Sequence, residues 1–181
     1  MRRLLPLAAV VLLPLSLTFC DDNNDDFVVP ISNGSVAIRD DCDSVSFNAG
    51  IAPGTCAKAG ATTLTAFNAE LTTNHSVAAW NFTPNELTVT VGGVITALNT
   101  GGEKHTFTEV ENFGGGFVPA LNTASGMATV APECAAIAGD ANALIPSGSS
   151  FTTDPEDSVG VEHYQCCIHP WMRANVTVVA R

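Results

Sequence analysis

Three residues with donor atoms that suit copper lie on one short stretch near the C-terminus. Cys166, His169 and Met172 are spaced as Cys-x2-His-x2-Met. A thiolate, an imidazole and a thioether are soft or borderline ligands, and two histidines with a cysteine and a distant axial methionine are typical of a blue electron-transfer site. Such a set needs a second imidazole, and His105, within segment 101–108, is the best placed. The spacing therefore predicts a mononuclear copper site.

Each of these residues taken alone has a more ordinary interpretation. A lone Met172 is most often core filler, a lone His105 a surface or capping residue, and Cys166 half of a disulfide. Their joint spacing, directly before a closing strand, favours the copper site over the three separate alternatives. His75 and His163 have no comparable partners in the sequence, and we expect both to be exposed.

The first 34 residues indicate export rather than part of a folded domain. Residues 1–19 begin with two arginines and continue as an uncharged, proline-interrupted apolar run, which is typical of a signal peptide and too short for a confident membrane span. Residues 17–20 resemble the lipobox of bacterial lipoproteins, although Phe19 departs from that pattern. Either Cys20 is lipidated or ordinary signal cleavage occurs nearby. Residues 20–34 are expected to form an acidic tether.

The net charge limits the choice of partner. The chain has 7 basic and 18 acidic residues and a formal charge of -11, which becomes -13 when Arg2 and Arg3 leave with the signal peptide. This charge argues against nucleic acid and anionic membrane surfaces as partners. It is compatible with a basic redox protein, and equally with simple solubility.

Residues 35–76 are predicted to form an N-terminal extension. The part up to residue 61 is rich in turn signals, and Cys42 and Cys56 bracket a 15-residue loop. In an oxidising compartment a disulfide closing that loop would stabilise the fold by roughly 3 kcal/mol. Segment 64–71 has helical spacing, with a strand as the alternative. We expect the extension to cover a sheet edge, while a docking role is the other interpretation.

Residues 77–181 read as one domain of short strands. Alternating apolar residues predict strands at 80–84, 86–91, 94–99, 104–110, 149–153, 159–166 and 175–180. Residues 111–148 are long for a connection and are expected to form one elaborated surface loop. Many short strands with turns between them predict an all-β, antiparallel β-sandwich.

The domain resembles the cupredoxins, the blue-copper family that includes plastocyanin, amicyanin and halocyanin. The resemblance rests on a histidine opening a strand and on a C-terminal Tyr-x-Cys-x2-His-Pro-x-Met before a final Val-rich strand. It implies a Greek-key sandwich and one type 1 copper cycling between Cu(I) and Cu(II). It also implies that His105, Cys166, His169 and Met172 are the ligands.

The neighbour of the thiolate ligand raises a separate question. Because side chains alternate along a strand, Cys167 should point away from a metal that Cys166 binds. A disulfide between Cys167 and Cys134 would pair the remaining cysteines, and this pairing is a hypothesis.

Two residues between the second histidine and the methionine are candidates for partner docking. In the resembling proteins that histidine emerges through an apolar patch, and Pro170 and Trp171 would supply part of such a patch. Alternatively, Trp171 simply covers the metal and excludes water.

The sequence thus predicts an exported electron carrier that is periplasmic or at the cell surface, with a lipid on Cys20 as the one candidate membrane anchor. We expect a monomer that exchanges electrons with redox proteins and turns over no substrate itself. The alternative is a module that stores or delivers copper at the cell surface. No nucleophile triad, zinc motif or nucleotide-binding loop indicates an enzyme.

Overall fold

The computed structural model describes residues 32–181, and within them eight strands, four α-helices and one 3-10 helix. The strands are β1 (Gly34–Arg39), β2 (Asn81–Thr83), β3 (Glu86–Thr90), β4 (Ile95–Asn99), β5 (Thr108–Val110), β6 (Ser150–Thr152), β7 (Gly160–Gln165) and β8 (Arg173–Val179). The helical elements are α1 (Ser44–Gly50), α2 (Leu64–Asn74), α3 (Pro119–Ala124), α4 (Pro132–Ala136) and the 3-10 helix η1 (Ala141–Ala143). The predicted signal peptide, Cys20 and most of the tether lie outside the described residues.

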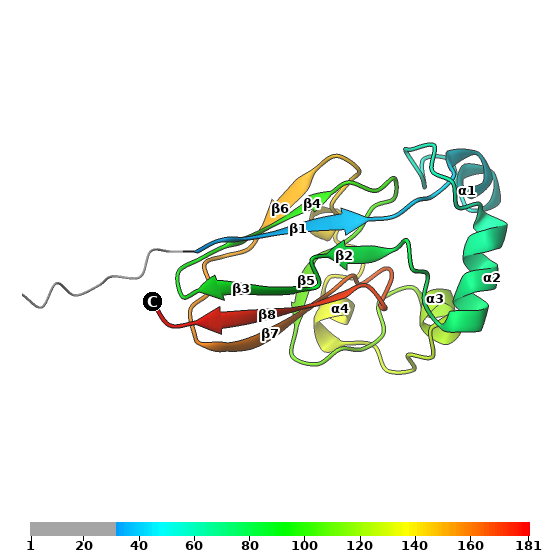
Figure 1. Ribbon diagram of the computed structural model, residues 1–181. Coiled ribbons are helices and arrows are strands. Elements are labelled where there is room, and N and C mark those ends of the chain that lie inside the picture. The colour runs from blue at the N-terminus through cyan, green and yellow to red at the C-terminus, as the bar shows by residue number, and fades with distance from the viewer. Residues whose placement is uncertain (1–31) are drawn as a thin grey trace, which may run out of the picture.

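The strands form two four-stranded sheets, which face each other as a sandwich (Figure 1). The first sheet has the order β2-β1-β4-β6 and the second the order β3-β8-β7-β5. From β3 to β7, successive strands alternate between the two sheets, which ties the layers together. The predicted all-β sandwich is confirmed.

The pairing is mixed rather than wholly antiparallel, which corrects part of the prediction. β1 pairs with β4 in parallel, and β3 pairs with β8 in parallel, while the other named pairs are antiparallel. A two-residue turn can join only antiparallel neighbours. Both parallel pairs join strands separated by long stretches of chain, so no tight turn constrains their direction.

The core lies between the sheets and follows the alternation of the strands. In β8 every second residue is buried, so that Ala174, Val176 and Val178 point inward. Val36 and Ile38 of β1 do the same from the first sheet, and both are fully buried. Each such side chain contributes about 1.5–3 kcal/mol through burial.

The N-terminal segment is part of the sandwich. We expected the domain to begin near Val77 and residues 35–76 to cover a sheet edge, but β1 lies inside the first sheet between β2 and β4. After β1 the chain forms α1 and α2 at one end of the sandwich (Figure 1). Asp43 caps α1 by accepting from the amides of Val45 and Ser46, and Thr63 caps α2. The helix predicted for segment 64–71 is confirmed, and the alternative strand is not formed.

Both predicted disulfides are present. Cys42 pairs with Cys56, with Cα atoms 6.1 Å apart, and Cys134 pairs with Cys167, with Cα atoms 5.3 Å apart. The second bridge fastens α4, and with it the long connection 111–148, to the end of β7. This connection contains α3, α4 and η1 and has a small apolar cluster of its own around that bridge.

The described residues, 32–181, include no helix long and apolar enough to cross a bilayer.

Candidate metal centre

The loop between β7 and β8 holds three of the four predicted ligands in a tight turn. Cys166 directly follows β7, and Met172 directly precedes β8. The amide of Cys166 donates to the carbonyl of Met172 at 3.0 Å, and the amide of Met172 donates to the carbonyl of His169 at 2.9 Å. These bonds fix the backbone of the three residues relative to one another, as the short spacing in the sequence suggested.

His105 approaches from another part of the chain. It lies three residues before β5 rather than inside a strand, and a two-way backbone bridge to Ile145 holds it. Its amide donates to the Ile145 carbonyl at 3.2 Å and its carbonyl accepts from the Ile145 amide at 2.7 Å. The long connection therefore helps to place this histidine.

The two imidazoles and the thiol converge on one point inside the protein. The Nδ1 atoms of His105 and His169 lie 3.6 and 3.8 Å from the Sγ atom of Cys166. One donor atom from each residue lies within 4.8 Å of the others. His105 and Cys166 are fully buried and His169 is 3% exposed. Two nitrogens and a thiol facing each other in a water-free setting are a donor set that fits copper.

Met172 lies beside this cluster in the core. Its side chain is 1% exposed and belongs to the same buried apolar cluster as Cys166. Its role as a fourth ligand is a proposal.

The surroundings of Cys166 favour the thiolate. Burial opposes ionisation, but hydrogen bonds and charge interactions with His105 and His169 hold the pKa of this thiol well below its ordinary value. The amide of Thr106 also points at the sulfur, at 3.5 Å. The thiolate, which is the form that binds metal, is thus stabilised before any ion arrives.

A carboxylate lies at the outer nitrogen of each imidazole. Asp40 Oδ2 is 2.8 Å from His105 Nε2, and Glu103 Oε2 is 3.5 Å from His169 Nε2. The indole of Trp80 donates to the same Glu103 oxygen at 2.7 Å. Outer partners of this kind orient histidine ligands and make them more basic.

The pKa values of the two carboxyl groups shift in opposite directions. Burial disfavours the Asp40 anion, but the hydrogen bond to His105 and those from the amides of Gly102 and Glu103 lower the pKa of Asp40 to about 2. Burial raises the pKa of Glu103, against the opposing effect of His169. Against its own burial, His105 gains from Asp40 and Cys166, which raise its pKa to about 9. Asp40 is therefore charged at neutral pH.

Aromatic rings from the N-terminal segment and from the ligand loop cover His169. Phe67 of α2 has its ring centroid 6.4 Å from that of His169, and Trp171 has its own at 5.4 Å. Phe67 also packs on Phe47, on Trp80 and on Trp171, at 5.6, 4.8 and 6.0 Å. The histidine edge is consequently enclosed by protein.

The two predicted docking residues are less exposed than expected. Pro170 is buried and Trp171 is half-buried, with its indole nitrogen buried and without a hydrogen-bond partner among the described residues. The ring of Trp171 packs against that of His169, and both of its roles, docking and covering the metal, stay predictions.

The other two histidines lie apart from the cluster. His75 is exposed, as expected, and its Nδ1 atom is 2.9 Å from the carbonyl of Ala124. His163 is half-buried rather than exposed, because its ring packs against Phe113 and its Nδ1 atom contacts Asn175.

Asp40, Glu103 and Phe67 are parts of the site that the sequence analysis missed. Glu103 is two residues before His105, which is a local signal that could have been used. Asp40 and Phe67 precede the predicted domain, and their role depends on β1 being an interior strand.

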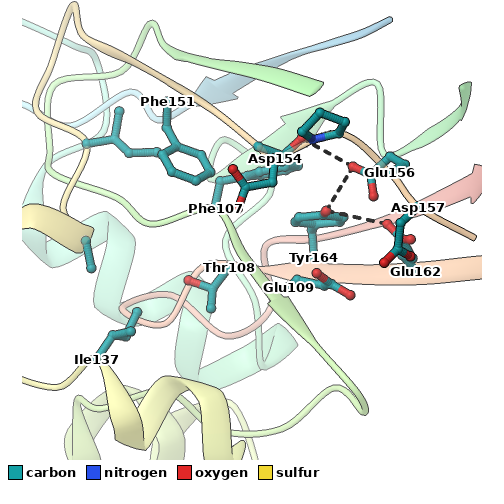
Figure 2. A pocket seen from close by; sticks show the side chains of 14 residues that line it. Phe107, Thr108, Glu109, Ile137, Phe151, Asp154, Glu156, Asp157, Glu162 and Tyr164 are labelled. Carbon is teal, nitrogen blue, oxygen red and sulfur yellow. Dashed lines mark hydrogen bonds between the residues drawn. The ribbon is translucent and has the colours of Figure 1, made fainter. Parts of the chain in front are cut away.

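A hollow of about 530 Å³ lies beside β5 and β7 (Figure 2). Phe107 stacks on Tyr164 there, with ring centroids 4.5 Å apart. Figure 2 shows the Tyr164 hydroxyl between Glu156 and Glu162, at 3.3 and 3.5 Å. Burial and the charge of neighbouring carboxylates raise the pKa of Glu162 to about 8. This hollow is thus lined by several carboxyl groups close to β7, the strand that precedes Cys166.

Comparisons with known proteins give neighbours in fold. No family model matches the chain, and no curated protein matches it. It is similar to a purple cupredoxin from Nitrosopumilus maritimus, with a TM-score of 0.42 and 17% identity over 81% of this chain and 100% of that one. A plastocyanin from Dryopteris crassirhizoma gives a TM-score of 0.41 and 16% identity, with the same coverage. A reduced Cu(I) form of an amicyanin variant gives 0.38 and 19%, over 57% and 78% of the two chains.

Likeness at these identities concerns the fold alone. The chain has the two-sheet sandwich that its sequence predicted, with the thiol and one imidazole on the loop between the last two strands. What the centre does is argued below from its own residues.

Proposed function

We propose that this protein is an exported type 1 copper protein that carries single electrons between redox partners. The observation that carries the proposal is the approach of two imidazole Nδ1 atoms to one buried thiol, at 3.6 and 3.8 Å. A carrier needs a donor set that accepts both oxidation states without rearranging. Two nitrogens and a thiolate held by two separate segments of the chain meet that need.

Each residue has a separate role in this account. Cys166 supplies the thiolate, and His105 and His169 supply the nitrogens through Nδ1. Met172 would supply a thioether from the same loop. A copper ion bound there would supply a one-electron couple. The backbone bonds of the loop and the bridge from His105 to Ile145 keep the ligands in one arrangement in both oxidation states.

Electron exchange is proposed to pass through the Trp171 side of the centre. Trp171 is half-buried and its ring lies next to that of His169, so it is a ligand neighbour that reaches the surface. The acidic charge of the chain favours a basic partner docking near this residue. A monomer with one copper is the unit proposed.

Export is supported by the cysteines as well as by the leader-like N-terminus. Two disulfides within residues 32–181 suit an oxidising compartment, where such bonds form and persist. The proposal places the protein in the periplasm or at the cell surface. A lipid on Cys20 is its proposed anchor.

Enclosure of the centre favours a carrier over a copper-delivery module. His105, Cys166 and Met172 are at most 1% exposed, and His169 is 3% exposed. A delivery protein must offer its ligands to a receiving protein, whereas a carrier benefits from slow metal exchange. The alternative function is thus less well supported by the site.

A chelator competition during redox cycling tests the choice. The copper-loaded protein is cycled with ascorbate and ferricyanide in the presence of a strong Cu(I) chelator, and copper content is measured after each cycle. A carrier should retain nearly all of its copper over many cycles. Rapid loss to the chelator in the first cycles would favour copper delivery instead.

A further inference from the structure

Asp40 is hydrogen-bonded to a predicted copper ligand and to the backbone around it. It directly follows β1, and its side chain is fully buried. Its Oδ2 atom is 2.8 Å from His105 Nε2 and accepts from the Glu103 amide at 3.0 Å. Its Oδ1 atom accepts from the amides of Gly102 and Cys42, at 2.9 and 3.2 Å. Four donors hold this carboxylate in a single orientation.

The surrounding backbone is shaped to admit the carboxylate. A Cβ atom at Gly101 would overlap the carboxylate of Asp40, so a glycine is required there. Gly101 thus allows a close approach between Asp40 and the loop that leads to His105, while Gly102 lies against the Cys42–Cys56 disulfide and contributes its amide to Asp40.

The contact decides which nitrogen of His105 carries a proton. A carboxylate accepts, so Nε2 must donate, and in the neutral imidazole that binds a metal the lone pair is then left on Nδ1. Nδ1 is the atom that faces the Cys166 sulfur. Asp40 therefore orients the His105 ring so that Nδ1, the nitrogen remote from Asp40, faces the site where a metal would bind.

Among residues 32–181, no lysine or arginine forms an ion pair with Asp40. Its ion-pair partner is His105, whose imidazole must be neutral to bind a metal. A buried anion next to a ligand interacts strongly, because little water screens it. Such a charge stabilises the oxidised state of the centre, which carries one more positive charge than the reduced state.

We propose that Asp40 is a positioning residue for His105 and that its buried negative charge lowers the reduction potential of the copper centre. This inference rests on the proposed function. It makes the N-terminal segment, through the residue that follows β1, a determinant of the potential at which the protein exchanges electrons.

The test compares two substitutions of the same chemistry at adjacent positions. Asp40→Asn removes the buried charge, and Asp41→Asn removes a partly exposed one whose side chain contacts Thr62 rather than a ligand. Reduction potentials are measured by spectroelectrochemistry on the copper-loaded full chain. We expect an upward shift in Asp40→Asn that clearly exceeds the shift in Asp41→Asn, with the thiolate absorption band retained.

A second variant and a second readout keep the test decisive. The Asn side chain would turn an NH2 group toward backbone amides, so Asp40→Ser is measured as well. In the diamagnetic Cu(I) protein, NMR should show a His105 Nε2 proton that exchanges slowly with water. At least one of Asp40→Ser and Asp40→Asn must raise the reduction potential. The slowly exchanging Nε2 proton of His105 must be lost in Asp40→Ser.

The failures of the two proposals are distinguishable. Equal potentials for the Asp40 and Asp41 variants, or a rapidly exchanging Nε2 proton in the unsubstituted protein, would overturn the role of Asp40 while leaving the copper site intact. Absence of a thiolate band in the unsubstituted protein would overturn the proposed function itself.

Discussion

Replacing Phe67 with alanine tests whether the N-terminal segment seals the metal centre. Phe67 is 4% exposed and packs against Phe47, Trp80, His169 and Trp171. Removing a buried phenylalanine ring costs roughly 3–5 kcal/mol of unfolding free energy. Because four rings lose a neighbour at once, we expect a loss of about 4 kcal/mol. Urea unfolding with the disulfides intact measures it.

The same substitution should open a path to the free thiol. Cys166 is the one free cysteine among residues 32–181, and it is fully buried. In the metal-free protein, Phe67→Ala should raise the rate at which iodoacetamide alkylates Cys166, followed by peptide mass spectrometry. The cavity left by the ring would lie beside His169, whose Nδ1 atom is 3.8 Å from the sulfur of Cys166.

Phe151→Ala is the matched control. It removes the same atoms from β6, where the ring is 42% exposed, and it should cost about 1 kcal/mol through the smaller area involved. It should leave the alkylation rate of Cys166 unchanged. The reasoning would be refuted if both variants lost equal stability, or if Phe67→Ala left Cys166 as unreactive as before.

Three further predictions concern stability. Replacing Cys134 and Cys167 together with alanine should cost about 4 kcal/mol in urea unfolding, because their bridge closes a loop with a sequence separation of 33; an unchanged midpoint would show that the bridge is not formed. The pKa of Glu162 is raised from 4.5 to about 8, chiefly by burial and then by Glu156, so the folded protein binds an extra proton between these values and loses stability as pH rises through them. Glu162→Gln should flatten this dependence between pH 5 and pH 8, and an unchanged slope would count against it. Copper at 100 times its dissociation constant should stabilise the fold by about 2.7 kcal/mol, and the gain in thermal unfolding should shrink markedly in Cys166→Ser.

Local spacing explains why the ligand loop could be predicted from the sequence. Cys166, His169 and Met172 lie within seven residues, so one tight turn must bring them together whatever the rest of the chain does. Side chains alternate along β7 and the two residues that follow it, so Cys167 faces the side opposite to Cys166 and pairs there with Cys134. These inferences needed only neighbouring residues.

The contribution of the N-terminal segment could not be predicted in the same way. β1 is six residues long and lies between turn-rich stretches, so its two buried residues, Val36 and Ile38, gave a weak strand signal. Its partner β4 lies about 60 residues away, and parallel pairing across that distance leaves no turn signature. Asp40 and Phe67 reach the centre only because of that pairing. Their roles depend on tertiary structure rather than on local pattern.

Local sequence likewise does not predict how exposed the residues around the centre are. The sequence places Trp171 next to His169, but it does not indicate that α2 packs over both. Burial of a loop residue depends on which distant element covers it, and that information is absent from the loop itself.

The most direct test of the copper assignment is the visible absorption and EPR spectrum after addition of one equivalent of Cu(II), repeated with Cys166→Ser. The arrangement of His105, His169 and Cys166 predicts an intense thiolate-to-copper band and a narrow copper hyperfine splitting, both lost in the variant. A pale spectrum typical of ordinary Cu(II), unchanged by the substitution, would contradict the assignment of Cys166 as a ligand and with it the proposed electron-carrier function.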